Sequence, residues 1–477
     1  MRTFRRLAGL ALLALAADLP LRAAEPLNFI FILADDMGWT DVGCFGSEFY
    51  ETPHIDRLAR EGMKFTSAYS ACTVCSPTRA AVLTGKYPAR LHLTDFILGE
   101  ARPFEKLKEP GWLKYLPLEE VTIAERLKAA GYATAHIGKW HLGDPPHSFG
   151  YPANQGFDLT VGGTSSARHL PPHGPLMNLP EQPEGFLTDR LTDAAVKFME
   201  ENRSRPFFIY LPHHAPHSPI QGKPEVIEKY RRKNATGLKQ NNPTYAALVE
   251  SVDDSIGKLL ATLTRLRLEE RTVVVFTTDN GGEVGGENRR AKATDCSPLR
   301  RGKGSPYEGG VRVPTMIKWP GVTRPGSVCD VPIISVDYFP TILEMAGQTP
   351  GALVDGQSLV PLLRGAPSLP REAIYWHFPH YHSPVDSPYS AVRAGAWKLI
   401  HFFQDDRVEL YNLEADIGEA KDLSMSQPEK AAELRARLAA WRTSVGAQLP
   451  TPNPQYDERR RWEYFRWNPN TLQLKKY

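Results

Sequence analysis

Residues 27–36, Leu-Asn-Phe-Ile-Phe-Ile-Leu-Ala-Asp-Asp, decide the fold class of this chain. The apolar residues form a continuous run instead of alternating with polar ones, which is typical of a strand buried on both faces of a parallel sheet. Two carboxylates, Asp35 and Asp36, end the run. Because open α/β sheets bind ligands beyond the carboxyl ends of their strands, we expect this pair to belong to a functional site.

Two later stretches repeat this design. Residues 206–211 (Pro-Phe-Phe-Ile-Tyr-Leu) lead to a His-His pair, and residues 273–278 (Val-Val-Val-Phe-Thr-Thr) lead to Asp279 and Asn280. The alternation of such strands with helical patterns predicts an α/β fold, with helices flanking a mostly parallel sheet. The helical patterns occupy residues 122–131, 189–201 and 245–268.

The last quarter of the chain has a different pattern. Residues 345–372 are rich in glycine and proline and predict a surface linker. Short strand-like segments and one helix follow, which predicts a small antiparallel α+β domain. The strands are expected at residues 373–377, 389–393, 397–401 and 408–411, and the helix at 428–441. We therefore divide the chain into an amino-terminal segment (1–24), a catalytic domain (25–350) and a carboxyl-terminal α+β subdomain (370–477).

The amino terminus has the pattern of a secretory signal peptide. Three arginines within the first six residues precede an apolar run at residues 7–17, which is too short to span a bilayer and suits the hydrophobic region of a signal. A buried amino-terminal helix is the alternative, and cleavage after Ala16 or after Ala24 remains open. No later segment offers 18 consecutive apolar residues, so we expect a secreted or periplasmic protein with no membrane segment after signal cleavage.

Charge and cysteine content narrow the function classes. The 57 basic and 54 acidic residues give a net charge of +3, and removal of residues 1–24 brings it to zero, which argues against a nucleic-acid partner. Five cysteines are an odd number for an exported protein, so one is expected to be free, modified or paired between chains. Cys72 and Cys75 form a C-x-x-C pair, but no second pair follows to complete a zinc site.

Residues 75–85, Cys-Ser-Pro-Thr-Arg-Ala-Ala-Val-Leu-Thr-Gly, match the signature C-x-P-x-R-x-x-x-L-T-G without a mismatch. This stretch resembles the type I sulfatases of the alkaline-phosphatase-like superfamily, in which the cysteine is oxidised to formylglycine. The resemblance implies an alkaline-phosphatase-like fold and a formylglycine-generating maturation enzyme as a transient partner. The aldehyde of Cys75 would act as its hydrate: one hydroxyl attacks sulfur, and the other lets the hemiacetal expel sulfate.

The carboxylates at the strand ends agree with this resemblance. Asp35-Asp36 and Asp279-Asn280 resemble the two metal-binding pairs of the family. Carried over, these four side chains bind the metal, with the modified Cys75 as a further ligand. Hard oxygen ligands suit Ca²⁺, with Mg²⁺ as the alternative. The metal would lower the pKa of the hydrate and neutralise sulfate oxygens.

Two blocks resemble sulfate-binding elements of the family. Residues 138–143 (Gly-Lys-Trp-His-Leu-Gly) imply that Lys139 holds a sulfate oxygen and that His141 takes the proton when the hemiacetal collapses. Residues 213–219 (His-His-Ala-Pro-His-Ser-Pro) place a sulfate-binding histidine at His217, with His214 as the competitor because it too is followed by x-Pro.

Three further residues complete the site that the resemblance implies. Residues 302–312 resemble the block G-K-x-x-x-x-E-G-G-x-R, in which Lys303 contacts sulfate and helps the leaving oxygen depart as an alcohol together with His217. Arg79 would orient the formylglycine hydroxyl. Ser166 matches a sulfate-contacting serine.

The resemblance implies an exported enzyme that hydrolyses sulfate monoesters, which we expect to be carbohydrate sulfates. Two alternatives remain: a phosphonate or phosphodiester hydrolase of the same superfamily, and an inactive protein that binds sulfated glycans. A loop with His377, His380 and His382 either shapes a sugar subsite or packs between the domains. Residues 457–467 mix arginines with aromatic residues, which suits either an amphipathic surface segment or the binding of an anionic sugar polymer.

Overall fold

A computed structural model of the chain describes residues 26–143, 150–285, 292–351, 353–382, 387–467 and 473–476. The signal peptide expected at residues 1–24 lies outside the described residues. Among the described helices, none combines the length and apolarity needed to cross a lipid bilayer. Eight strands form the central sheet, in the order β11-β2-β10-β9-β1-β8-β6-β7. They are β1 (Asn28–Ala34), β2 (Met63–Phe65), β6 (Ala133–Gly138), β7 (Leu159–Gly162), β8 (Phe207–Pro212), β9 (Thr272–Thr278), β10 (Thr315–Lys318) and β11 (Ser327–Cys329).

The central sheet is mostly parallel, as the sequence predicts. Strand β1 lies between β8 and β9 and runs parallel to both, and β6 and β7 extend this parallel arrangement. Only β10 runs against its neighbours β9 and β2. The three strands predicted from continuous apolar runs, β1, β8 and β9, are thus adjacent at the centre of the sheet.

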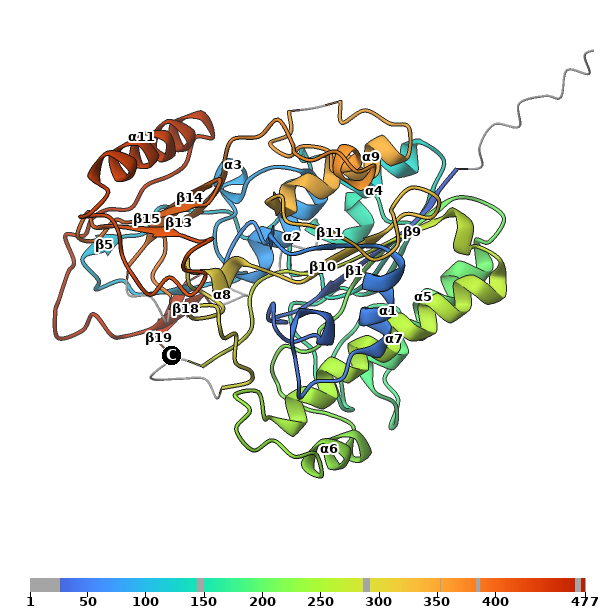
Figure 1. Cartoon of the computed structure of the whole chain (residues 1–477). Coiled ribbons are helices and arrows are strands. Elements are labelled where there is room, and N and C mark those ends of the chain that lie inside the picture. Colours follow the sequence, from blue (N-terminus) through green and yellow to red (C-terminus); the bar gives the residue numbers. More distant parts are fainter. Residues whose placement is uncertain are drawn as a thin grey trace, which may run out of the picture.

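Strand β1 is buried on both faces, which explains its continuous apolar sequence. Phe29, Phe31 and Leu33 pack on one side, and the intervening residues pack on the other. The first side is covered by α2 (Cys75–Thr84), α4 (Ile123–Ala129) and α9 (Tyr338–Met345). The opposite side is covered by α1 (Pro53–Glu61), α5 (Leu187–Glu201) and α7 (Pro243–Leu266) (Figure 1).

Local sequence explains where the predicted helices begin. At α4, Thr122 accepts a hydrogen bond from the backbone of Glu125, whose side chain accepts one from the backbone of Thr122. At α7, Asn242 caps the first turn and Pro243 occupies the first helical position. The shorter elements are α3 (Pro88–Leu91), α6 (Pro224–Arg231), α8 (Glu308–Val311), α10 (Val360–Leu363), β3 (Ala68–Tyr69) and β12 (Ile333–Ile334).

The carboxyl-terminal region forms the predicted antiparallel sheet with one covering helix. The four strands are adjacent in chain order, and α11 packs on them (Figure 1). Their bounds are β13 (Ile374–Phe378), β14 (Tyr389–Ala394), β15 (Trp397–Phe402), β16 (Val408–Asn412) and α11 (Pro428–Ser444).

The end of the chain returns to the first half of the molecule. Three short strands, β17 (Thr451–Pro452), β18 (Phe465–Trp467) and β19 (Leu474–Lys476), lie in this tail. Strand β17 pairs with β5 (Leu107–Lys108), and β18 pairs with both β19 and β4 (Glu100–Ala101). The sequence did not predict this pairing, because these strands are two or three residues long and the partners of β17 and β18 in the first half of the chain lie more than 300 residues away.

A buried ion network joins the two sheets. Lys398 of β15 lies 2.8 Å from a carboxylate oxygen of Glu308 and 3.0 Å from one of Glu419. All three side chains are fully buried, and the backbone N–H of Glu308 donates to Glu419. Because Glu308 begins α8, five residues after Lys303, the network fixes this predicted site segment to the carboxyl-terminal sheet.

We predict that Lys398→Met lowers the free energy of unfolding by about 3–5 kcal/mol, because it leaves Glu419 buried without its cation and leaves Glu308 with Arg312 alone. The matched control is Lys197→Met, which removes an exposed lysine that pairs with Glu201 at 3.8 Å; it should cost less than about 1 kcal/mol. Urea denaturation followed by tryptophan fluorescence measures both. Equal stability of the two variants would contradict this account of the network.

Candidate active site

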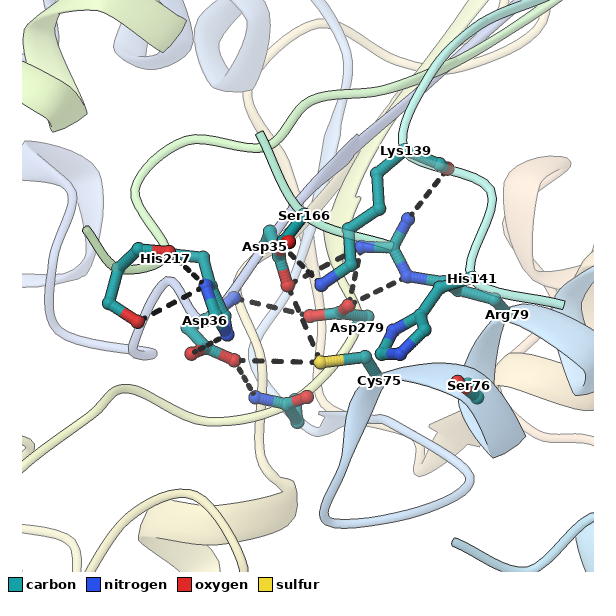
Figure 2. Close-up of polar contacts among 12 residues, drawn as sticks. Asp35, Asp36, Cys75, Ser76, Arg79, Lys139, His141, Ser166, His217 and Asp279 are labelled. Carbon is teal, nitrogen blue, oxygen red and sulfur yellow. Dashed lines mark hydrogen bonds and ion pairs between the residues drawn. The ribbon is translucent and has the colours of Figure 1, made fainter. Parts of the chain in front are cut away.

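Two neighbouring strands bring the predicted carboxylates together. Strands β1 and β9 pair in parallel with Ala34 opposite Thr278, so the residues that follow them emerge at the same edge of the sheet. These are Asp35 and Asp36 after β1, and Asp279 and Asn280 after β9. Cys75 begins α2 and points its sulfur into this group (Figure 2).

Close contacts connect the thiol and the carboxylates. The sulfur of Cys75 lies 3.5 Å from Oδ1 of Asp35 and 3.9 Å from Oδ1 of Asp36. Asn280 donates from its amide nitrogen to Asp36 Oδ1 over 2.7 Å. Asp36 has a left-handed backbone (φ 63°), and its N–H donates to Asp279 Oδ1 over 3.2 Å. The two strand ends are therefore fixed to each other.

Three cations balance the three buried carboxylates. Arg79, on α2, donates from Nε and Nη2 to Asp279 Oδ2 over 3.0 and 2.6 Å. Lys139, after β6, donates to Asp35 over 2.7 Å, and Lys303 donates to Asp36 over the same distance. Paired charges of this kind are tolerated in a protein interior, whereas isolated ones are very costly.

The local charges decide the protonation states. Burial alone would raise the pKa of Asp36, but Lys303, His217 and Lys139 outweigh it and hold the pKa well below its usual range. Burial raises the pKa of the Cys75 thiol well above its ordinary value, although the two lysines oppose this. The unmodified thiol is therefore neutral at physiological pH and a poor nucleophile, while Asp36 is ionised.

The histidines occupy different environments. His217 Nε2 lies 3.5 Å from Asp36 Oδ2, and burial lowers the pKa of its ring well below the ordinary value. His141 bonds through Nε2 to the carbonyl oxygen of Ile97. Because a carbonyl only accepts, Nε2 carries the proton, and Nδ1 has no partner among the described residues. His214 is buried and does not line the cavity described below, which favours His217 over its competitor.

The donor set fits a hard divalent cation. Oδ1 of Asn280 is buried and has no hydrogen-bond partner among the described residues, an arrangement that is unfavourable unless another group binds it. The ligand atoms of Asp35, Asp36, Cys75 and His217 all lie within 4.8 Å of one another. Carboxylate and amide oxygens are the ligands that Ca²⁺ and Mg²⁺ prefer.

A cavity of about 990 Å³ opens above this group. The predicted site residues that line it are Cys75, Lys139, His141, Ser166, His217, Lys303 and His382. The other two loop histidines lie elsewhere: His377 bonds to Ser390 Oγ and to the carbonyl oxygen of Gln448, and His380 bonds to Thr94 Oγ1. Those two therefore pack between segments, and only His382 can serve the expected sugar subsite.

Part of the cavity wall has no counterpart in the sequence-based site. A loop at residues 96–100 lines one side, and Ser76 Oγ accepts the N–H of Ile97 in this loop. The tail contributes Tyr464, Arg466 and Trp467. The sequence identified residues 457–467, which include these three, as a basic and aromatic segment, but it did not place them at this site, since only the folded chain brings the tail to the cavity. The five cysteines are all free, and Cys72 is buried.

The comparisons with known proteins agree with this geometry. A model of the sulfatase family matches residues 27–348, and one described as N-sulphoglucosamine sulphohydrolase, C-terminal, matches residues 302–444. Arylsulfatase A of Homo sapiens is 35% identical over 428 residues, covering 82% of this chain and 77% of that protein. A sulfatase of Formosa agariphila is 32% identical over 500 residues, covering 88% of this chain and 89% of that protein.

The solved structure of Ps i-CgsB in complex with k-i-k-neocarrahexaose has a TM-score of 0.75 to this chain at 29% identity. The match covers 91% of this chain and 95% of that one. The resemblance noted in the sequence, and the alkaline-phosphatase-like fold that it implies, are confirmed. The chain therefore belongs to the sulfatase family and is a sulfuric ester hydrolase.

Proposed function

We propose that this sulfatase is exported, as a secreted or periplasmic enzyme, and cleaves sulfate monoesters of saccharides with a nucleophile derived from Cys75. The position of Cys75 carries the proposal. Its side chain lies at the floor of the cavity, beside Asp35 and Asp36, at the first residue of α2. The size of the cavity and the saccharide complex of the similar structure support a sugar substrate.

The cavity floor suits a sulfate group. Lys139 and Lys303 both line the cavity, and their ammonium groups donate to Asp35 and Asp36. The first turn of α2 begins at Cys75 without a side-chain cap, so its backbone N–H groups and the helix dipole favour an anion there. Ser166, at the cavity wall, is proposed to contact a sulfate oxygen.

Two histidines are proposed to move protons. The unprotonated Nδ1 of His141 can accept a proton from the nucleophile side, since Nε2 is held by Ile97. His217 has a low pKa, so once protonated it can donate the proton to the leaving oxygen. Lys303 contacts the same carboxylate as His217, that of Asp36. Arg79 orients the nucleophile indirectly by fixing Asp279 and the carbonyl of Lys139.

Two groups complete the proposed site. Formylglycine at position 75 would supply two hydroxyls on one carbon, one to attack sulfur and one whose deprotonation lets sulfate leave. A Ca²⁺ ion, with Mg²⁺ as the alternative, would be held by Asp35, Asp36, Asp279, Asn280 and the modified Cys75 side chain, and would neutralise sulfate oxygens. The intact set of these residues argues against an inactive glycan-binding protein, and the sulfatase match does not favour a phosphonate or phosphodiester hydrolase.

We predict that the protein releases sulfate only when Cys75 has been converted by a formylglycine-generating enzyme. The neutral, buried thiol lacks both hydroxyls, so unconverted protein and Cys75→Ala should fall at least about 10³-fold in kcat/KM. Ion chromatography of released sulfate and mass spectrometry of the peptide containing residue 75 measure activity and conversion. Cys329→Ala, which changes a cysteine on edge strand β11, is the matched control. Equal turnover by unconverted protein would refute the proposal.

We predict that Asp279→Asn weakens Ca²⁺ binding by more than about 100-fold and abolishes turnover, because it removes a charged ligand that Arg79 holds in place. Isothermal titration calorimetry measures the affinity, and thermal melting verifies that the variant is folded. Asp193→Asn, on the exposed side of α5, is the control and should bind as the wild type does. Unchanged affinity in the Asp279 variant would remove this residue from the proposed metal site.

A further inference from the structure

The cavity extends well beyond the groups assigned to sulfate. Its volume of about 990 Å³ lies at the upper end of the roughly 300–1,000 Å³ that is usual for small-molecule sites. On the side formed by the tail, the lining consists of Tyr464, Arg466 and Trp467, which we call the tail wall. A substrate that extends from the cavity floor along this side would therefore reach residues from the end of the chain.

The tail wall is held firmly in place. Asn453 donates to the carbonyl oxygens of Pro103 and Glu105 over 2.8 and 2.7 Å. The guanidinium of Arg102 lies 4.3 Å from the ring centroid of Tyr464, and Arg102 is itself buried. Together with the pairing of β18 and β4, these contacts fix the position of the tail wall relative to the catalytic domain.

Arg466 is the charged group of the wall. It donates from Nε and Nη2 to one oxygen of Glu100, over 3.1 and 2.7 Å. Its side chain is 46% exposed to solvent. An incoming anion can therefore reach the guanidinium, although the carboxylate of Glu100, whose side chain is 15% exposed, competes for it. A guanidinium binds sulfate or carboxylate through two parallel hydrogen bonds.

An aromatic residue lines the same cavity as this arginine, and the tail is rich in basic residues. Trp467 follows Arg466 on β18, and Lys114 Nζ lies 4.8 Å from the indole of Trp467. The described tail carries more positive than negative charge, in contrast to the balanced chain. Its basic residues are Arg459, Arg460, Arg461, Arg466, Lys475 and Lys476, and its acidic residues are Asp457, Glu458 and Glu463.

We propose that the tail wall is a subsite for a second anionic group, a sulfate or carboxylate on the sugar next to the one that is desulfated. Arg466 binds this anion in exchange for Glu100, and Trp467 packs on the sugar ring. The inference rests on the proposed function and narrows it: the preferred substrate is an oligosaccharide with charge on neighbouring sugars.

The test compares two oligosaccharides that differ only in a second sulfate on the neighbouring sugar. Their affinities are measured by calorimetry on full-length Cys75→Ala protein, which binds without turnover. We expect the doubly sulfated ligand to bind at least about tenfold more tightly, since a hydrogen bond to a charged group has this effect. Arg466→Gln should abolish the preference, and Glu100→Gln should increase it because it removes the competing carboxylate. Arg459→Gln, the same change elsewhere on the tail, should leave it unaltered.

Two results would overturn the subsite. One is an equal preference in the Arg466→Gln and parent proteins, and the other is a loss of preference in Glu100→Gln that matches the loss in Arg466→Gln. The second result would mean that the ion pair only supports the fold of the wall. Sulfate release by converted wild-type protein is assayed in parallel on an aryl sulfate, so failure of the proposed function is seen separately from failure of the subsite.

Discussion

Three carboxylates and three cations lie together, buried, at the carboxyl edge of the central sheet. The stability of this site depends on the pairing of their opposite charges. Each acid has its own cation: Asp35 with Lys139, Asp36 with Lys303, and Asp279 with Arg79. Without these cations, the carboxylates would repel one another in an interior that screens charge poorly. The parallel pairing of β1 with β9 is what forces them together.

The carboxyl-terminal domain also helps to form the active site. Lys398 of β15 binds Glu308, which lies in the segment that carries Lys303, and the tail adds a wall to the cavity. Both parts of the chain therefore contribute to one site. The central sheet places the reacting groups, and the later part of the chain fixes one lysine and shapes the space for the rest of the substrate.

Local patterns were enough to predict the central strands, the flanking helices and the antiparallel domain. The continuous apolar run of β1 reflects burial on both faces, and the Thr122–Glu125 capping box marks a helix start. Ordered motifs also brought Cys75 and Lys139 into the candidate site. Such patterns work because the information lies within a few neighbouring residues.

Contacts between distant segments could not be predicted from the sequence. Strands β17 and β18 pair with residues more than 300 positions away, and nothing in their composition specifies those partners. The loop histidines show the same limit: His377 faces Ser390 and Gln448, whereas His382 faces the cavity. Their spacing alone does not distinguish packing from ligand contact.

The most direct test of the account is anomalous diffraction from crystals of the converted protein grown with Ca²⁺. The account predicts one ion at the carboxyl edge, bound at about 2.3–2.6 Å by oxygens of Asp35, Asp36, Asp279 and Asn280 and by the modified Cys75 side chain. An ion found only at the separate cluster of His54, Asp253 and Asp254, with none among these ligands, would contradict it.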